Sequence, residues 1–196
     1  MNTQQESCQL RPLSWEEIRA LYRSRMQEDF PQAELKPLDL LQHFYEEGLL
    51  LGYSLDQGEQ RGLAYALLEA PQEGDVWLLD YLAVDKAQRG HGWGSRCLSL
   101  LPKELPQIQA LVLEIERLDK AVDEAQVQLR QRRKAFYLGN GIQETGVFAQ
   151  AFGVDYEILA LPVSGPLSAQ EAAQAMERLY PRFFSREQFV VYGPKD

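Results

Sequence analysis

Residues 75–101 read DVWLLDYLAVDKAQRGHGWGSRCLSLL, and the rest of the chain is organised around them. Residues 76–84 are apolar or aromatic except for Asp80, which is typical of a strand covered on both faces. A glycine-rich turn follows at residues 88–95, and apolar side chains then recur at helical spacing from Cys97 to Leu101. The stretch therefore predicts a buried strand, a tight turn and a helix.

The glycine-rich turn has the composition of an anion-binding site. Glycines at 90, 92 and 94 allow positive φ and a close approach of the backbone to a ligand. The first N–H groups of a helix carry a partial positive charge and bind phosphate oxygens. Arg89 adds a planar cation that suits phosphate. We expect this turn to bind phosphate groups.

Four interpretations of the turn compete. A Walker loop requires Gly-Lys-Ser/Thr, and Gly94-Ser95 has no lysine between its residues. A dinucleotide fingerprint requires GxGxxG, whereas these glycines alternate as GxGxG. A turn without any ligand is the third interpretation, and a pyrophosphate loop of an acyl-CoA-binding fold is the fourth.

The composition restricts the class of protein. The 196 residues fit one domain with an extension, and their net charge of −9 argues against binding to nucleic acid or to an anionic membrane. We find no membrane-span pattern and no signal peptide, and we expect a cytoplasmic location. Two cysteines, Cys8 and Cys97, with His43 and His91 show no metal-site spacing, so we expect no metal.

The order of predicted elements indicates a mixed sheet. An opening strand at 9–13 and two helices, the first capped by Ser14 and Glu17, precede three strands joined by short turns. After the helix that follows the glycine turn, the strand 110–116 is expected to run parallel to the strand 76–84. A helix at about 120–138 and two closing strands follow. We predict an α/β (α+β) fold, with a mostly antiparallel central sheet flanked by helices.

Two motifs in this order resemble those of the GNAT superfamily of N-acetyltransferases. The first is Arg89-x-x-Gly92-x-Gly94 after the strand that ends Leu82-Ala83-Val84. The second is residues 133–142, RKAFYLGNGI, which is similar to the helix-end motif of the family, with Gly141-Ile142 in place of Gly-Phe. The resemblance covers about residues 10–161 and implies a GNAT-like fold and acetyl-CoA as co-substrate.

The resemblance also implies where acetyl-CoA binds. In the family the fourth and fifth strands separate and receive the pantetheine arm, so the backbone of Leu82, Ala83 and Val84 is expected to pair with that arm. The pyrophosphate is expected on the turn, which is made of Arg89, Gly90, His91, Gly92, Trp93, Gly94 and Ser95. Arg130 stands where family members often carry an asparagine that helps to hold the cofactor.

Family members attack the thioester directly with the amine, and this chemistry needs two proton transfers. Tyr137 matches the tyrosine that protonates the departing thiolate. The candidates for the base are Asp80, Glu114 and Glu116, with Asp80 and Glu116 preferred, and a water chain remains an alternative. Asp80 interrupts an apolar strand, where burial raises the pKa of a carboxyl group.

Beyond Pro162, residues 164–196 form an expected helix-strand extension packed on the acetyltransferase domain of residues 1–163. Its apolar residues Phe183, Phe184 and Phe189 could pack on the domain, cover the acceptor site or contact a second copy in a homodimer. The acceptor is a small-molecule amine or a protein amino group. The alternatives are a non-catalytic acyl-CoA-binding or regulatory module and an acyltransferase that uses a longer acyl-CoA.

Overall fold

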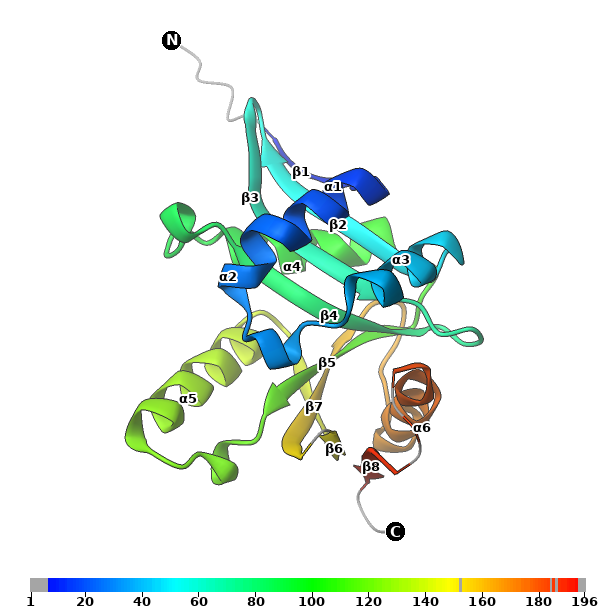
Figure 1. Ribbon diagram of the computed structural model, residues 1–196. Coiled ribbons are helices and arrows are strands. Elements are labelled where there is room, and N and C mark those ends of the chain that lie inside the picture. Colours follow the sequence, from blue (N-terminus) through cyan, green and yellow to red (C-terminus); the bar gives the residue numbers. More distant parts are fainter. Residues whose placement is uncertain (1–6, 152, 184, 186, 194–196) are drawn as a thin grey trace. The chain divides into compact units, whose positions relative to one another are not determined.

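The computed structural model describes residues 7–151, 153–183, 185 and 187–193. Within these residues the strands form an eight-stranded, mostly antiparallel sheet with the order β1-β2-β3-β4-β5-β7-β6-β8 (Figure 1). The strands are β1 (Cys8–Pro12), β2 (Leu50–Gln57), β3 (Gln60–Glu69), β4 (Val76–Val84), β5 (Ala110–Glu116), β6 (Gln143–Ala151), β7 (Val154–Pro162) and β8 (Phe189–Tyr192).

The α-helices lie between β1 and β2, β4 and β5, β5 and β6, and β7 and β8, and the predicted mixed α/β fold is confirmed. They are α1 (Trp15–Leu21), α2 (Gln27–Asp29), α3 (Leu38–Glu46), α4 (Trp93–Glu104), α5 (Glu124–Gly139) and α6 (Ala169–Leu179). A π-helical segment, η1 (Tyr22–Met26), joins α1 to α2, and short 3-10 segments are η2 (Gln32–Glu34), η3 (Lys86–Gln88), η4 (Leu118–Lys120) and η5 (Tyr180–Arg182). No helix among the described residues is long and apolar enough to cross a membrane.

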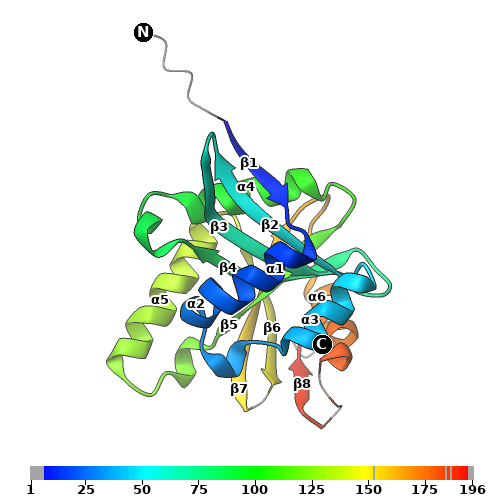
Figure 2. The same cartoon turned by 45° about the horizontal axis from the view of Figure 1, so that its top comes forward.

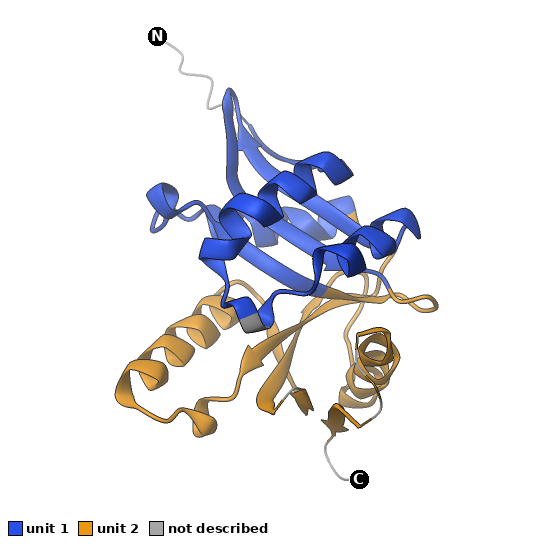
Figure 3. Cartoon of the chain, in the orientation of Figure 1, with its two compact units in different colours: residues 1–70, 79–104 blue, residues 71–78, 105–196 orange. Residues whose placement is uncertain are grey.

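The chain divides into two compact units (Figure 3). Unit 1 consists of residues 1–70 and 79–104 and contains β1, β2, β3 and the end of β4. Helices α1, α2 and α3 cover one face of these strands, and α4 lies on the other face (Figures 1 and 2). Close packing requires Gly52 in β2, because a Cβ there would lie 3.0 Å from Cδ1 of Ile18 in α1.

Unit 2 consists of residues 71–78 and 105–196. In it the start of β4 pairs in parallel with β5, from Val76 with Ala110 to Leu78 with Val112, as the sequence predicts. Antiparallel pairing then joins β5 to β7, β7 to β6, and β6 to β8. The extension shares the core of unit 2: α6 packs its apolar side chains with those of β5, β6 and β7, and these α6 residues are Ala172, Ala175, Met176 and Leu179.

Side-chain caps set where the helices begin. The predicted capping box of Ser14 and Glu17 is present at α1, and a second capping box, formed by Ser168 and Glu171, begins α6. The helix predicted from about residue 120 begins at Glu124 instead, because the Asp123 side chain accepts a hydrogen bond from the Gln126 N–H and caps it there. The domain boundary predicted between residues 163 and 164 stays a prediction, and Phe184 lies outside the described residues.

The Ser168 cap is testable through stability. Replacing Ser168 with alanine removes the acceptor for the Glu171 N–H, and we expect the free energy of unfolding to fall by ~1 kcal/mol. Urea denaturation followed by circular dichroism measures the change. Ser164→Ala, at an exposed serine outside the helix, is the control and should change stability by less than about 0.5 kcal/mol.

Candidate acetyl-CoA site

The turn between β4 and α4 has the backbone geometry that an anion cradle needs. Gly90 and Gly92 have φ of +83° and +82°, and a Cβ at either position would meet nothing within 4 Å. Only glycine adopts this conformation without strain, and both backbones are open to an approaching ligand. Helix α4 begins at Trp93, so its first N–H groups have no partner inside the helix. The predicted phosphate-binding turn therefore exists as a conformation, and its ligand stays a prediction.

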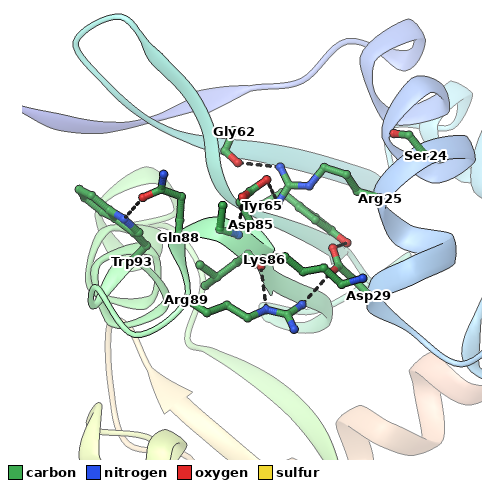
Figure 4. A network of polar contacts seen from close by, with 12 residues as sticks. Ser24, Arg25, Asp29, Gly62, Tyr65, Asp85, Lys86, Gln88, Arg89 and Trp93 are labelled. Carbon is green, nitrogen blue, oxygen red and sulfur yellow. Dashed lines mark hydrogen bonds and ion pairs between the residues drawn. The ribbon is translucent and has the colours of Figure 1, made fainter.

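Arg89 is tied back to its own unit (Figure 4). Its Nη2 donates to Oδ1 of Asp29 in α2 at 2.8 Å, and its Nε donates to the carbonyl oxygen of Val84 at 3.3 Å. Asp29 also accepts a hydrogen bond of 2.9 Å from the hydroxyl of Tyr65 in β3. Half of the Arg89 side chain remains exposed, at 53%. Arg89 therefore anchors the turn to α2 while its outer face stays open to solvent.

Gln88 holds the other side of the turn. Its backbone carbonyl lies 3.2 Å from Nδ1 of His91, and its side-chain oxygen accepts from the indole N–H of Trp93 at 3.3 Å. The side chain of Asp85 caps η3 by accepting a hydrogen bond of 2.9 Å from the Ala87 N–H. These contacts hold the turn around Asp85 and Gln88, and the space beside Gly90 and Gly92 stays open.

Asp80 in β4 lies in a buried cluster that the sequence did not predict. Oδ2 of Asp80 is 2.8 Å from the ammonium nitrogen of Lys36, which also donates to Oε1 of Glu69 at 3.0 Å. The Glu69 side chain is fully buried, and the side chains of Lys36 and Asp80 are 13% and 10% exposed. All three residues belong to unit 1. We call them the Lys36–Glu69–Asp80 cluster.

Burial and charge decide the protonation states in this cluster. Burial lowers the pKa of Lys36, but the negative charges of Asp80 and Glu69 outweigh it, so the lysine stays an ammonium. Burial raises the pKa of Glu69 to about 8, with Asp80 adding to the rise and Lys36 opposing it. Glu69 is therefore protonated at neutral pH, in contrast to an exposed glutamate.

Two tyrosines hold the backbone of Lys36 in place. The Lys36 N–H donates to the hydroxyl of Tyr81 at 2.9 Å, and its carbonyl accepts from the hydroxyl of Tyr22 in η1 at 2.9 Å. Tyr81 in turn donates to the carbonyl of Glu34 at 2.9 Å. Pro37 follows and restricts the conformation of Lys36 further. The ammonium group is thus positioned by a rigid backbone as well as by its carboxylate partners.

Tyr137 lies in the last turn of α5 in unit 2. Its side chain is half-buried and its ring packs edge-on against Phe136 at 5.2 Å. Among the described residues its hydroxyl has no hydrogen-bond partner. Burial raises the pKa of Tyr137, and the positive charge of Arg133 opposes that rise. Tyr137 is therefore a neutral phenol with a proton available to donate.

The two carboxylates of β5 have different partners. Glu114 accepts a short hydrogen bond from the hydroxyl of Tyr180, which follows α6. Glu116 accepts from Nη2 of Arg130 in α5 at 2.7 Å and lies 3.5 Å from Nη1 of Arg133. Arg130 also donates to the carbonyl of Arg117 at 2.6 Å. Arg130, which stands where the family often has asparagine, is thus occupied by β5.

Cys97 belongs to the protein core. The Cys97 thiol is fully buried in α4, and burial raises its pKa to about 12, so it is a core thiol rather than a nucleophile. Cys8 and Cys97 are both free cysteines. In the described part of the chain, no three His, Cys, Asp or Glu side chains lie close enough together to hold a metal ion.

A model of the acetyltransferase (GNAT) family matches residues 15–126, which is more than half of the chain. The chain belongs to the GNAT acetyltransferase family. The match includes β4, the glycine turn and the Lys36–Glu69–Asp80 cluster and ends before Tyr137, so the role of Tyr137 stays a prediction. No curated protein matches the chain significantly.

Solved structures share the fold. A putative GNAT acetyltransferase from Bacteroides thetaiotaomicron is 18% identical, with 86% of this chain and 93% of that chain covered and a TM-score of 0.65. The ribosomal-protein-S18-alanine N-acetyltransferase from Escherichia coli is 21% identical, with 82% and 97% covered and a TM-score of 0.55. The spermidine N-acetyltransferase from Vibrio cholerae, solved with CoA and spermine, is 11% identical, with 80% and 96% covered and a TM-score of 0.58.

The family makes this chain an N-acetyltransferase, and acetyl-CoA is the co-substrate typical of the family. Unit 1 contains Asp80, the turn 89–95 and residues 82–84, which are predicted to pair with the cofactor, whereas unit 2 contains Glu114, Glu116 and Tyr137. Sequence reasoning missed Lys36 and Glu69. Glu69 gave a usable signal, because it ends the apolar run 63–68 just as Asp80 interrupts the run 76–84.

The raised pKa of Glu69 predicts how stability depends on pH. Between about pH 4.5 and about pH 8 the folded chain keeps a proton on Glu69 that the unfolded chain releases. The free energy of unfolding should therefore fall as the pH rises through this window. Glu69→Gln should remove this decrease, whereas Glu16→Gln, at an exposed glutamate, should keep it. Urea denaturation at several pH values measures the slope, and an equal slope in wild type and Glu69→Gln would contradict the prediction.

Proposed function

We propose that this enzyme transfers the acetyl group of acetyl-CoA to a primary amine by direct attack of the amine on the thioester. The observation that carries the proposal is the glycine turn. Gly90 and Gly92 hold positive φ with open space where a side chain would stand, directly before the N-terminus of a twelve-residue helix. Such a turn can receive a pyrophosphate on backbone N–H groups.

Two segments would hold acetyl-CoA. The backbone of Leu82, Ala83 and Val84 would pair with the pantetheine arm as an added strand does. The turn formed by Arg89, Gly90, His91, Gly92, Trp93, Gly94 and Ser95 would hold the pyrophosphate. Because Asp29 already binds one edge of Arg89, the backbone N–H groups are the main phosphate donors in this proposal, and the exposed part of Arg89 adds positive charge.

Tyr137 acts as the general acid in the proposed reaction. The departing CoA thiolate needs a proton, and a neutral phenol without a hydrogen-bond partner is suited to donate one. The half-buried setting of Tyr137 keeps the phenol neutral, which supports this role.

Asp80 acts as the base, and Glu116 is the alternative. Both carboxylate oxygens of Glu116 are already engaged by guanidinium groups, Oε1 by Arg130 and Oε2 by Arg133. Asp80 has one cationic partner and shares it with Glu69. This difference supports Asp80 over Glu116.

The acceptor is a small-molecule amine or a protein amino group. The structurally similar proteins include one named for spermidine and one named for the alanine of a ribosomal protein, which are both amine acceptors. The net charge of −9 favours a cationic acceptor. Residues 164–196 form an extension of the acetyltransferase domain of residues 1–163, and this extension could provide a homodimer contact. The two free cysteines suit a reducing cytoplasmic location.

Calorimetric titration with acetyl-CoA, followed by an amine panel, tests the function. The panel contains spermidine, lysine and a peptide with N-terminal alanine, and free CoA thiol is the readout. We expect acetyl-CoA to bind and at least one amine to release thiol. Binding without turnover on any amine would favour a non-catalytic acyl-CoA-binding module, and turnover only with a longer acyl-CoA would identify a different acyltransferase.

The acid role predicts the effect of Tyr137→Phe. The substitution removes only the hydroxyl, so kcat should fall by about 100-fold or more while the Kd for acetyl-CoA changes little. Steady-state thiol release and calorimetry measure the two quantities. Phe136→Leu, at the neighbouring exposed ring, is the control for packing at the end of α5. An unchanged kcat in Tyr137→Phe would remove Tyr137 from the mechanism.

A further inference from the structure

One buried group of unit 1 has no part in the mechanism as proposed so far. Glu69, at the end of β3, is fully buried and shares the Lys36 ammonium with Asp80. Two carboxylates around one ammonium carry one excess negative charge, and a buried excess charge is costly. Uptake of a single proton by the carboxylate pair removes that cost. The cluster is therefore built to hold one exchangeable proton.

The geometry shows where that proton can reside. Oε1 of Glu69 accepts the hydrogen bond from Lys36 at 3.0 Å. Oε2 of Glu69 is buried and has no hydrogen-bond partner among the described residues. A carboxylate oxygen that is buried without a donor is unfavourable, whereas a protonated oxygen at this position leaves no lone negative charge. Oε2 is thus the natural position of the proton on Glu69, whose other oxygen shares the Lys36 ammonium with Asp80.

We propose that Glu69 and Asp80 act as one proton-accepting pair, in which Asp80 takes the proton of the acceptor ammonium and Glu69 retains it, with Lys36 as the positioning residue. This inference rests on the proposed function, because it assigns Asp80 the role of base. Lys36 positions the two carboxylates with its ammonium group, and its own backbone is held in place by hydrogen bonds with the hydroxyls of Tyr22 and Tyr81.

The protons balance in this scheme. The ammonium of the acceptor gives one proton to Asp80, directly or through one water, and the freed lone pair forms the C–N bond as the C–S bond breaks. The departing thiolate takes the proton of Tyr137. The second proton that nitrogen loses in forming the amide returns through solvent to the Tyr137 phenolate. The proton on the Glu69–Asp80 pair is then released to solvent, so each turnover yields one proton.

A shared proton makes the pair a stronger base than Asp80 facing Lys36 alone. The pKa of Glu69, raised by burial and by Asp80 to about 8, lies near the working pH, where general bases are most effective. The charged and titratable groups around the pair are Lys36, Tyr81 in β4 and Tyr22 in η1. Burial and the charge of Asp80 raise the pKa of Tyr81. Tyr81 therefore stays neutral where the pair titrates.

The pH dependence of kcat/KM tests this role with the best amine of the panel, from about pH 6 to about pH 10. For the wild-type enzyme we expect kcat/KM to increase as the pH rises through about 8, because the Glu69–Asp80 pair loses its proton there. In Glu69→Gln the midpoint of this rise in kcat/KM should move down by about one pH unit or more. The plateau value of kcat/KM at high pH should fall by about tenfold or more, because the base is weaker. The amine titrates identically in both enzymes, so the difference isolates Glu69.

Glu157→Gln is the matched control. Glu157 in β7 is also a buried glutamate bound by a lysine, Lys134, at 2.8 Å, but it lies in unit 2 outside the cluster. Its substitution should leave the midpoint of the profile at the wild-type position. An unchanged midpoint and plateau in Glu69→Gln would overturn the inference, because a residue with only a structural role would not shift the profile.

A carboxyl titration supplies a readout that needs no acceptor. In wild-type protein with ¹³C-labelled glutamate side chains, one carboxyl resonance should titrate near pH 8, and it should be missing in Glu69→Gln. If no glutamate titrates above about pH 7, the inference is overturned even where the variant fails to fold. Failure of the wild type to acetylate any amine, with the titration present, would instead overturn the proposed function.

Discussion

A charge that leaves water must be compensated inside the protein, and the proposed reaction depends on how unit 1 meets this constraint. Asp80 interrupts an apolar strand, and Lys36 neutralises it at 2.8 Å from a segment 44 positions earlier in the chain. Glu69 joins the same ammonium from the neighbouring strand β3. Lys36 lies in the segment that precedes α3. Its ammonium group therefore links this segment to both β3 and β4.

Near the glycine turn, the charges that are compensated are positive. Arg89 has Asp29 as its partner and Lys86 has Glu28, at 2.8 and 3.0 Å, so two basic side chains of this region are bound by α2. The unpartnered positive character of the turn then comes mainly from the backbone of Gly90–Ser95 and from the start of α4. A family motif that shows an arginine thus describes an anchor as much as a ligand. We therefore expect the glycine backbone, rather than Arg89, to provide most of the phosphate binding.

Much of the fold could be predicted because it depends on local patterns. The apolar run 76–84, the glycine turn and the capping residues Ser14 and Ser168 each act within a few positions of themselves. These patterns predicted the order of the elements, the parallel pairing of β4 with β5 and the position of Cys97 on the apolar side of a helix. The predicted start of α5 was about four residues too early. The helix begins at Glu124 because Asp123 is the residue whose side chain caps it.

The environment of the site residues could not be predicted in the same way. Lys36 with Glu69 and Arg89 with Asp29 pair across 33 and 60 positions, and such pairs leave no periodic trace in a sequence. Composition shows that charges are present, but not which of them meet. For this reason the sequence identified Asp80 as a candidate base without its partners, and it identified Glu116 without the two arginines that bind it.

Acetyl-CoA affinity of two matched glycine variants tests the central claim, which is that the backbone of the turn holds the pyrophosphate. Gly92 and Gly48 both have positive φ, +82° and +71°, and at both a Cβ would meet nothing within 4 Å. Alanine at either position therefore introduces similar strain, about 1–2 kcal/mol. We expect calorimetry to show a loss of acetyl-CoA affinity of about tenfold or more for Gly92→Ala and none for Gly48→Ala. Equal affinity in both variants and the wild type would contradict it.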